Sequence, residues 1–145
     1  NKEINNINKN NIKIIISGRL KNISSKISNI LKKVQKKTKN NNKITVNLAI
    51  NYGSKTEIID AIKKINYNSQ KMTVENINKN LYSNLAFPDI LVRTGAQKRL
   101  SNFMLWQIAY AEIFFLDKLW PDFTKSDLKK IILKYHKIKR NFGGI

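Results

Sequence analysis

Two arginines and a serine stand close together in a turn that follows an apolar run, and their side chains suit an anion. Arg93 and Arg99 flank a short segment that contains a glycine, and Ser101 comes two residues later. A guanidinium group offers a rigid fork of N–H donors that matches phosphate or carboxylate oxygens, and a hydroxyl adds one more donor. Backbone N–H groups near a helix start would strengthen such a site. This pattern indicates a clamp for phosphate or diphosphate.

Nearby carboxylates leave a second interpretation open. Glu112 begins the aromatic-rich run EIFFL, where an unpaired charge would be costly. It could pair with a clamp arginine, as Asp89 could, or it could hold Mg²⁺ together with a bound diphosphate. No Walker-type loop and no GxGxxG motif supports nucleotide binding. The single histidine, His136, is typical of a surface residue on a lysine-rich helix.

The chain is strongly basic, with a formal net charge of +19. Such a charge is typical of proteins that bind nucleic acids. The cations are mostly Lys, however, the apolar residues are often Ile, and Asn is abundant, so a bias toward A/T-rich codons explains all three excesses together. The lysines are scattered and lack interleaved aromatic residues. A nucleic-acid-binding domain stays an alternative, and the cations that such a bias disfavours become candidates for function: Arg19, Arg93, Arg99 and Arg140.

The elements that must position these residues alternate between strands and helices. Hydrophobic periodicity predicts strands over 12–17, 44–50, 90–92 and 112–116, and helices over 20–39, 56–65, 73–82, 101–109 and 126–139. This order is typical of an α/β fold with a mostly parallel sheet flanked by helices. Because the carboxyl ends of parallel strands meet at one edge, we expect one site built from three turns: Gly18–Arg19, Asn51–Gly53 and Arg93–Ser101.

Length and composition set the class of protein. The 145 residues are enough for one domain, and no linker divides them. No apolar run approaches the roughly 20 residues that span a bilayer, and no signal peptide is visible. The absence of cysteine excludes disulfides and thiolate metal sites, and it fits a cytoplasmic protein.

The segment 89–123 also resembles a known signature. It contains D-x-L-x-R-T-G-x-x-x-R-x-S-N-F-x-L-W-Q-x-A-Y-x-E followed by L-W-P-D-F, which is similar to the cis-prenyltransferase family and specifically to its bacterial undecaprenyl diphosphate synthases. N-Y-G-S-K at 51–55 resembles the N-Y-G-G-R of that family, and the terminal F-G-G resembles its R-F-G-G. The resemblance implies the family's α/β fold, with residues 1–145 as the carboxyl-terminal part of a single domain whose amino-terminal part is missing.

The resemblance implies an activity and roles for the clamp. The family condenses isopentenyl diphosphate with an allylic diphosphate such as farnesyl diphosphate, uses Mg²⁺, and makes long-chain polyprenyl diphosphates such as undecaprenyl diphosphate, a lipid carrier of cell-wall synthesis. By resemblance, Arg93, Arg99 and Ser101 would hold the isopentenyl diphosphate, and Glu112 would contribute to the Mg²⁺ site.

Further residues take weaker roles from the same resemblance. Asp89 would sit beneath the clamp, and Asn51 would lie near the reacting diphosphates. Gln97 stands where the family usually has a glutamate. Arg140 and Gly143 match an Arg-x-Gly element, displaced by one residue, that completes the site of the partner subunit in this family.

The differences from the family shape the remaining expectations. The family's amino-terminal D-G-N-G-R-W-A stretch, whose Asp holds Mg²⁺, has no counterpart here. We therefore expect this chain alone to be inactive or nearly so. The full protein is expected to be a cytoplasmic homodimer, peripheral to the inner face of the membrane, that binds no nucleic acid. An alternative is a non-catalytic cis-prenyltransferase-like subunit that lends its clamp and tail to a partner.

Overall fold

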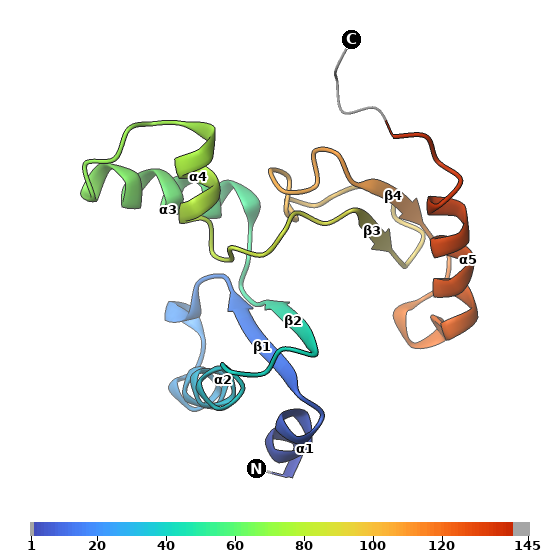
Figure 1. Cartoon of the computed structure of the whole chain (residues 1–145), viewed down its shortest axis with the longest axis horizontal. Helices are drawn as coiled ribbons and strands as arrows, with labels where there is room; N and C mark the ends of the chain where they lie inside the picture. Colours follow the sequence, from blue (N-terminus) through green and yellow to red (C-terminus); the bar gives the residue numbers. More distant parts are fainter. Residues whose placement is uncertain (1, 141–145) are drawn as a thin grey trace. The chain divides into compact units, whose positions relative to one another are not determined.

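The computed structural model describes residues 2–140 (Figure 1). The chain forms two compact units, Asn1–Leu85 and Ala86–Ile145. The first unit contains α1 (Lys2–Lys9), β1 (Ile12–Ser17), η1 (Leu20–Asn22), α2 (Ser25–Lys37), β2 (Ile44–Ala49), α3 (Ser54–Tyr67) and α4 (Val74–Asn80). The second contains β3 (Ile90–Arg93), β4 (Glu112–Phe115), η2 (Trp120–Asp122) and α5 (Lys125–Tyr135).

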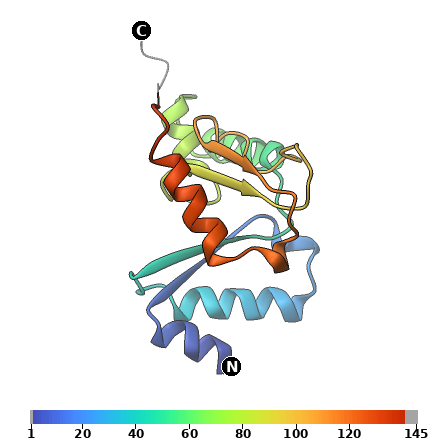
Figure 2. The ribbon, with the colours of Figure 1, turned by 90° about the vertical axis from the view of Figure 1, so that its right-hand side faces the viewer.

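The first unit is organised around a parallel pair of strands. β1 and β2 pair from Ile12–Ile44 to Ser17–Ala49, and α1 and α2 lie on one side of them (Figure 2). Thr38 joins helix to strand, because its hydroxyl accepts from the Ile14 N–H at 3.0 Å. The linkage holds the carboxyl end of α2 against β1.

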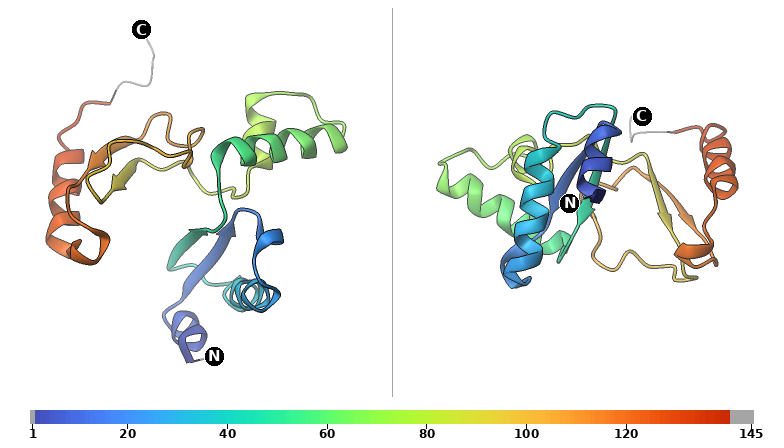
Figure 3. Two further views of the ribbon diagram at one scale, coloured as in Figure 1. Left: turned by 180° about the vertical axis from the view of Figure 1, so that it is seen from behind. Right: turned by 90° about the horizontal axis from the view of Figure 1, so that it is seen from below.

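The second unit repeats the parallel arrangement. β3 and β4 pair from Ile90–Glu112 to Arg93–Phe115, and α5 runs alongside them (Figure 3). A capping box begins α5: the Thr124 hydroxyl accepts from the Asp127 N–H, and the Asp127 carboxylate accepts from the Thr124 N–H. Parallel strands flanked by helices confirm the predicted α/β fold in each unit, while the single-domain assignment stays a prediction.

The structure corrects two predicted helices. Residues 101–109 form turns rather than a helix, because Ser101, Asn102 and Met104 adopt φ values of 47°, 62° and 46°, outside the helical region. The helix predicted from residue 20 begins at Ser25, since the Ser24 side chain accepts from the Ile27 N–H and caps the helix there. Within residues 2–140, no helix is both long enough and apolar enough to cross a bilayer.

Candidate functional site

The clamp loop rests on a backbone ladder that continues past the ends of β3 and β4. The Leu116 N–H donates to the Arg93 carbonyl at 2.8 Å, and the Ala96 N–H donates to the Leu116 carbonyl at 3.0 Å. Gly95, with φ of 88°, donates to the Lys118 carbonyl at 2.8 Å. Because the backbone is tied at three successive points, the start of the loop has a fixed position relative to the sheet.

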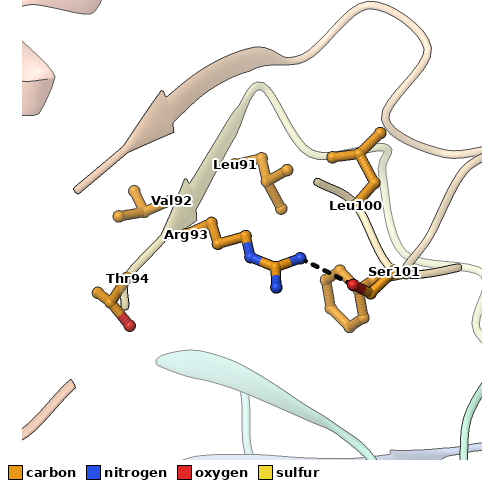
Figure 4. A pocket seen from close by; sticks show the side chains of 7 residues that line it. Leu91, Val92, Arg93, Thr94, Leu100 and Ser101 are labelled. Carbon is orange, nitrogen blue, oxygen red and sulfur yellow. Dashed lines mark hydrogen bonds between the residues drawn. The ribbon is translucent and has the colours of Figure 1, made fainter. Parts of the chain in front are cut away.

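Arg93 ties the far end of the same loop. Its guanidinium donates to the Ser101 hydroxyl at 3.1 Å (Figure 4). It also donates to the Arg99 carbonyl. The three residues predicted to form the clamp are therefore brought together. Arg93 and Ser101, but not Arg99, border a pocket of about 280 Å³ lined by Leu91, Val92, Arg93, Thr94, Leu100, Ser101 and Phe103. Apolar walls beside a guanidinium strengthen its attraction for an anion, since they replace water near the charge.

Arg99 is positioned by a neutral partner. Its guanidinium donates to the Gln97 amide oxygen at 2.5 Å. In residues 2–140, neither Arg93 nor Arg99 forms an ion pair with a carboxylate, so the alternative in which Asp89 or Glu112 neutralises the clamp is not realised. Two guanidinium charges on one short loop remain available for an external anion.

The other two arginines of the chain are paired with carboxylates. Arg19 contacts both Asp60 oxygens, at 2.8 and 2.5 Å. Arg140 donates to Asp89 at 2.6 Å and to the Tyr135 hydroxyl at 2.6 Å, and the Asp89 contact is the main reason why the pKa of Arg140 is raised. Both guanidinium groups therefore serve the packing of their own unit.

Asp89 and Glu112 lie at the end of the β3–β4 sheet opposite the clamp. The Glu112 N–H donates to the Asp89 carbonyl at 2.9 Å, whereas Arg93 pairs in register with Phe115. Glu112 and Phe115 are three residues apart on β4, so about 10 Å of strand separates Glu112 from the position opposite Arg93. No group of three or more His, Cys, Asp or Glu side chains that could hold a metal occurs in the described part of the chain. Glu112 alone does not make a magnesium site, and its assignment as a metal ligand stays a prediction.

In the first unit, the turns after β1 and β2 meet as the parallel arrangement predicts. The Arg19 N–H donates to the Asn51 carbonyl at 3.3 Å, and the Asn51 side-chain amide donates to the Arg19 carbonyl at 2.8 Å. Asn51 therefore links the two turns through its side chain. The position of Asn51 near the reacting diphosphates stays a prediction. So does the expectation that these turns meet the clamp. Gly143 lies outside the described residues.

A polar network lies beside these turns, and the sequence did not predict it. Glu57, 2% exposed, accepts from the Tyr52 hydroxyl at 2.5 Å and from the Tyr82 N–H at 2.8 Å. Asp60 accepts from Arg19 and from the Tyr82 hydroxyl at 2.5 Å. The hydrogen bond from Arg19 lowers the pKa of Asp60 to about 2, and burial raises the pKa of Tyr82 to about 12. The available signal was the spacing of Glu57 and Asp60, which places them on one helix face.

The fold has parallel strands, and its clamp loop carries two guanidinium groups that form no ion pair within residues 2–140. Both features suit a protein that handles phosphorylated substrates. The family described as "Putative undecaprenyl diphosphate synthase" matches residues 1–143. The chain belongs to this family of isoprenyl transferases. Its resemblance to cis-prenyltransferases, seen in the signature around Arg93, is confirmed.

Individual relatives agree with this membership. The chain is 43% identical to an isoprenyl transferase of Fusobacterium nucleatum, over 97% of this chain and 61% of the relative. It is 40% identical to a ditrans,polycis-undecaprenyl-diphosphate synthase of Blochmanniella floridana, over 99% of this chain and 60% of the relative. The chain thus spans about three fifths of the length of these curated relatives.

Solved structures share the fold. A "probable undecaprenyl diphosphate synthase" from Campylobacter jejuni superimposes with a TM-score of 0.91 at 38% identity, covering 99% of this chain and 68% of that one. Lavandulyl diphosphate synthase from Lavandula x intermedia, in complex with dimethylallyl diphosphate, superimposes with a TM-score of 0.85 at 26% identity. It covers 92% of this chain and 61% of that one.

Proposed function

We propose that this chain supplies the half of a cis-prenyltransferase site that holds isopentenyl diphosphate. The observation that carries the proposal is the pair of guanidinium groups, Arg93 and Arg99, that no carboxylate neutralises in the described chain. The allylic partner would be farnesyl diphosphate or a similar compound, and the product a long-chain polyprenyl diphosphate such as undecaprenyl diphosphate. Membership in an isoprenyl transferase family supports this choice of substrate class.

The clamp would act by binding and orientation. The diphosphate of the isopentenyl substrate would lie against Arg93, Arg99 and the Ser101 hydroxyl, where charge-assisted hydrogen bonds are strongest. Its hydrocarbon end would contact the apolar side of the pocket, which includes Leu91 and Phe103. A fixed substrate pose lets the isopentenyl double bond attack the allylic carbon as the allylic C–O bond breaks, after which a proton is lost.

The same proposal includes Mg²⁺ as cofactor, a homodimeric assembly and a location at the inner face of the membrane. Mg²⁺ binds diphosphates readily with one or two protein carboxylates, and Glu112 could supply one of these. The described residues do not form a metal site by themselves. A second copy of the chain and a cytoplasmic location follow from the family resemblance, as does peripheral contact with a membrane.

A non-catalytic subunit is the second candidate. Within residues 2–140, Glu112 belongs to no group of three or more side chains that could hold a metal ion, which favours this candidate. Such a subunit would lend its clamp to a partner with the metal-binding residues. Turnover of farnesyl and isopentenyl diphosphates by the purified chain with Mg²⁺ would exclude this role, whereas activity only after mixing with such a partner would support it.

The clamp itself is tested by calorimetric titration of the chain with isopentenyl diphosphate. Arg93→Ala and Arg99→Ala should each weaken binding by about 10- to 100-fold, since each removes a charge-assisted contact. Arg140→Ala is the matched control, because it removes the same charge from a residue that pairs with Asp89. Equal losses in all three variants would indicate diffuse attraction and would contradict the clamp. Tight, salt-sensitive RNA binding without diphosphate binding would favour the nucleic-acid alternative.

A further inference from the structure

The helix α2 presents a basic face on the side that points away from β1. Its buried residues, Ser28 and Val34, lie on the side that packs on the strand pair, and the opposite side faces away from the strands (Figure 2). Four exposed residues share that opposite side, because spacings of four, three and four residues keep them on one helix face: Lys26, Ile30, Lys33 and Lys37. Ile27 lies at the edge of this face. We call these five residues the outer face of α2.

Two isoleucines stand among the lysines of the outer face. Ile27 and Ile30 are each 50% exposed, and they lie about one helical turn apart. Their exposed apolar area is unfavourable in water, and its burial against an apolar phase would be favourable. Apolar side chains bordered by lysines on one side of a helix are typical of helices that lie in the interface of a bilayer.

The lysines of the outer face have few acidic competitors. The sequence contains no Asp or Glu between residues 4 and 56. Glu3 lies on α1, and of the later carboxylates of the first unit one is buried and two pair with other cations: Glu57, Asp60 and Glu75. Lys37 donates to the neutral Asn5 side chain at 2.5 Å, which leaves the lysine charge in place. The outer face therefore carries a net positive charge that an anionic partner would compensate.

Codon bias does not account for this charge pattern. A bias toward A/T-rich codons raises the lysine content, but it does not remove carboxylates, because the Glu codon GAA and the Asp codon GAT are also rich in A and T. The absence of acidic residues over this long stretch is therefore a separate observation from the abundance of lysine. Both together make the outer face of α2 a candidate surface for an anion-rich partner.

The apolar residues favour a membrane over a nucleic acid as that partner. Nucleic-acid surfaces commonly stack bases on aromatic side chains, and the first aromatic residue of the chain is Tyr52, well after α2. Isoleucines gain little beside a sugar-phosphate backbone, whereas they leave water when they enter the acyl boundary of a bilayer. Lysines suit the same boundary, because their methylene stems stay near the acyl chains while their charged ends reach the lipid phosphates.

We infer that the outer face of α2 docks on the surface of an anionic lipid bilayer. The helix lies along the membrane plane over about 20 Å, the length of its thirteen residues. Ile27 and Ile30 enter the boundary between headgroups and acyl chains, and the lysines contact lipid phosphates. The inference rests on the membrane contact in the proposed function and names the surface for it, but the isopentenyl diphosphate clamp plays no part in it.

The test is co-sedimentation of the full chain with vesicles of phosphatidylcholine, with and without phosphatidylglycerol. Binding only to the vesicles that contain phosphatidylglycerol is expected, and it should weaken as salt is added. Ile30→Ser should lower the partition coefficient by about tenfold, because it removes apolar area from the contact. Leu133→Ser, which removes a 53% exposed leucine from α5, is the matched control and should leave the coefficient unchanged. Equal losses in these two variants would overturn the inference.

The lysines are tested by two pairs of substitutions that lower the net charge equally. Lys33→Gln combined with Lys37→Gln should weaken vesicle binding by about tenfold. Lys125→Gln combined with Lys129→Gln, at the same spacing on α5, should have a much smaller effect. Equal weakening by both pairs would indicate diffuse attraction to the whole chain and would overturn the inference. A preference for RNA over the vesicles at the same salt concentration would also overturn it.

A tryptophan at position 30 reports insertion directly. With phosphatidylglycerol vesicles, the emission of Ile30→Trp should shift to shorter wavelength relative to the unmodified chain, because the indole leaves water, whereas Leu133→Trp should show no such shift. An unshifted emission at position 30 would contradict docking through α2. Pyrophosphate titration without vesicles separates this inference from the clamp. Vesicle binding without pyrophosphate binding contradicts the clamp alone, and pyrophosphate binding without vesicle binding contradicts the docking of α2 alone.

Discussion

The Gln97 amide oxygen accepts a hydrogen bond from the Arg99 guanidinium at 2.5 Å, so Arg99 is held in place without losing its charge. The family usually has a glutamate at this position. A carboxylate would bind Arg99 as an ion pair and would repel an incoming diphosphate unless a cation bridged them. The amide therefore favours direct anion binding to the clamp.

Gln97→Glu should make diphosphate binding depend on a cation. In EDTA, the affinity for pyrophosphate should fall by about 5- to 10-fold, because a negative charge now lies beside Arg99. Adding Mg²⁺ should recover more affinity in the variant than in the unmodified chain. Calorimetric titrations of both proteins in EDTA and in Mg²⁺ measure the difference, and a variant that binds more tightly in EDTA would contradict this account of the clamp.

Arg140→Ala should destabilise the second unit and spare the clamp. The side chain loses its contacts with Asp89, the Tyr135 hydroxyl and the Tyr110 carbonyl, and we expect a loss of about 1–2 kcal/mol in the free energy of unfolding. Both tryptophans lie in this unit, so their fluorescence during urea unfolding reports its stability. Unchanged stability together with lost pyrophosphate binding would assign Arg140 to the site instead.

The Arg19–Asp60 pair should make the first unit sensitive to acid. The pKa of Asp60 is lowered from 3.8 to about 2 in the folded chain, so the pair adds stability above about pH 4 and loses it as the pH falls toward 2. With allowance for the exposed guanidinium, the contribution is about 1 kcal/mol. Amide exchange of α3 between pH 5 and pH 2 should show this loss, and Asp60→Asn should remove it. Glu3→Gln, which removes an exposed carboxylate from α1, is the control and should leave the pH dependence of α3 exchange unchanged.

Gly18→Ala should disrupt the turn that joins β1 to η1. A Cβ at this position would lie 2.1 Å from the Ile50 carbonyl oxygen, and the φ of 120° is one that L-residues rarely adopt. We expect a loss of more than about 2 kcal/mol in the free energy of unfolding of the first unit. Gly95→Ala is a useful comparison, because its φ of 88° is also positive but no atom lies within 4 Å of the added Cβ. Far-UV circular dichroism during urea unfolding compares the two, and equal losses would show that the Ile50 contact contributes nothing.

Much of the fold could be predicted because local patterns and packing agree. The apolar run of β1 and the spaced isoleucines of α3 each follow one period along the chain, and the structure confirms both elements. The helix predicted over 101–109 failed for a physical reason. Arg93 draws Ser101 and the Arg99 carbonyl toward it, and the residues that follow adopt positive φ values that a helix excludes.

The sequence by itself determined the class of chemistry, since residue types and their spacing around Arg93, Arg99 and Ser101 are local properties of one loop. Only the tertiary structure decided which of the four guanidinium groups remain available for an external anion. Arg19 pairs with Asp60 and Arg140 with Asp89, across 41 and 51 residues of chain, and such distant pairings depend on packing rather than on sequence spacing. Within residues 2–140, the same packing leaves the two clamp arginines without a carboxylate partner and places Glu112 at the other end of their sheet.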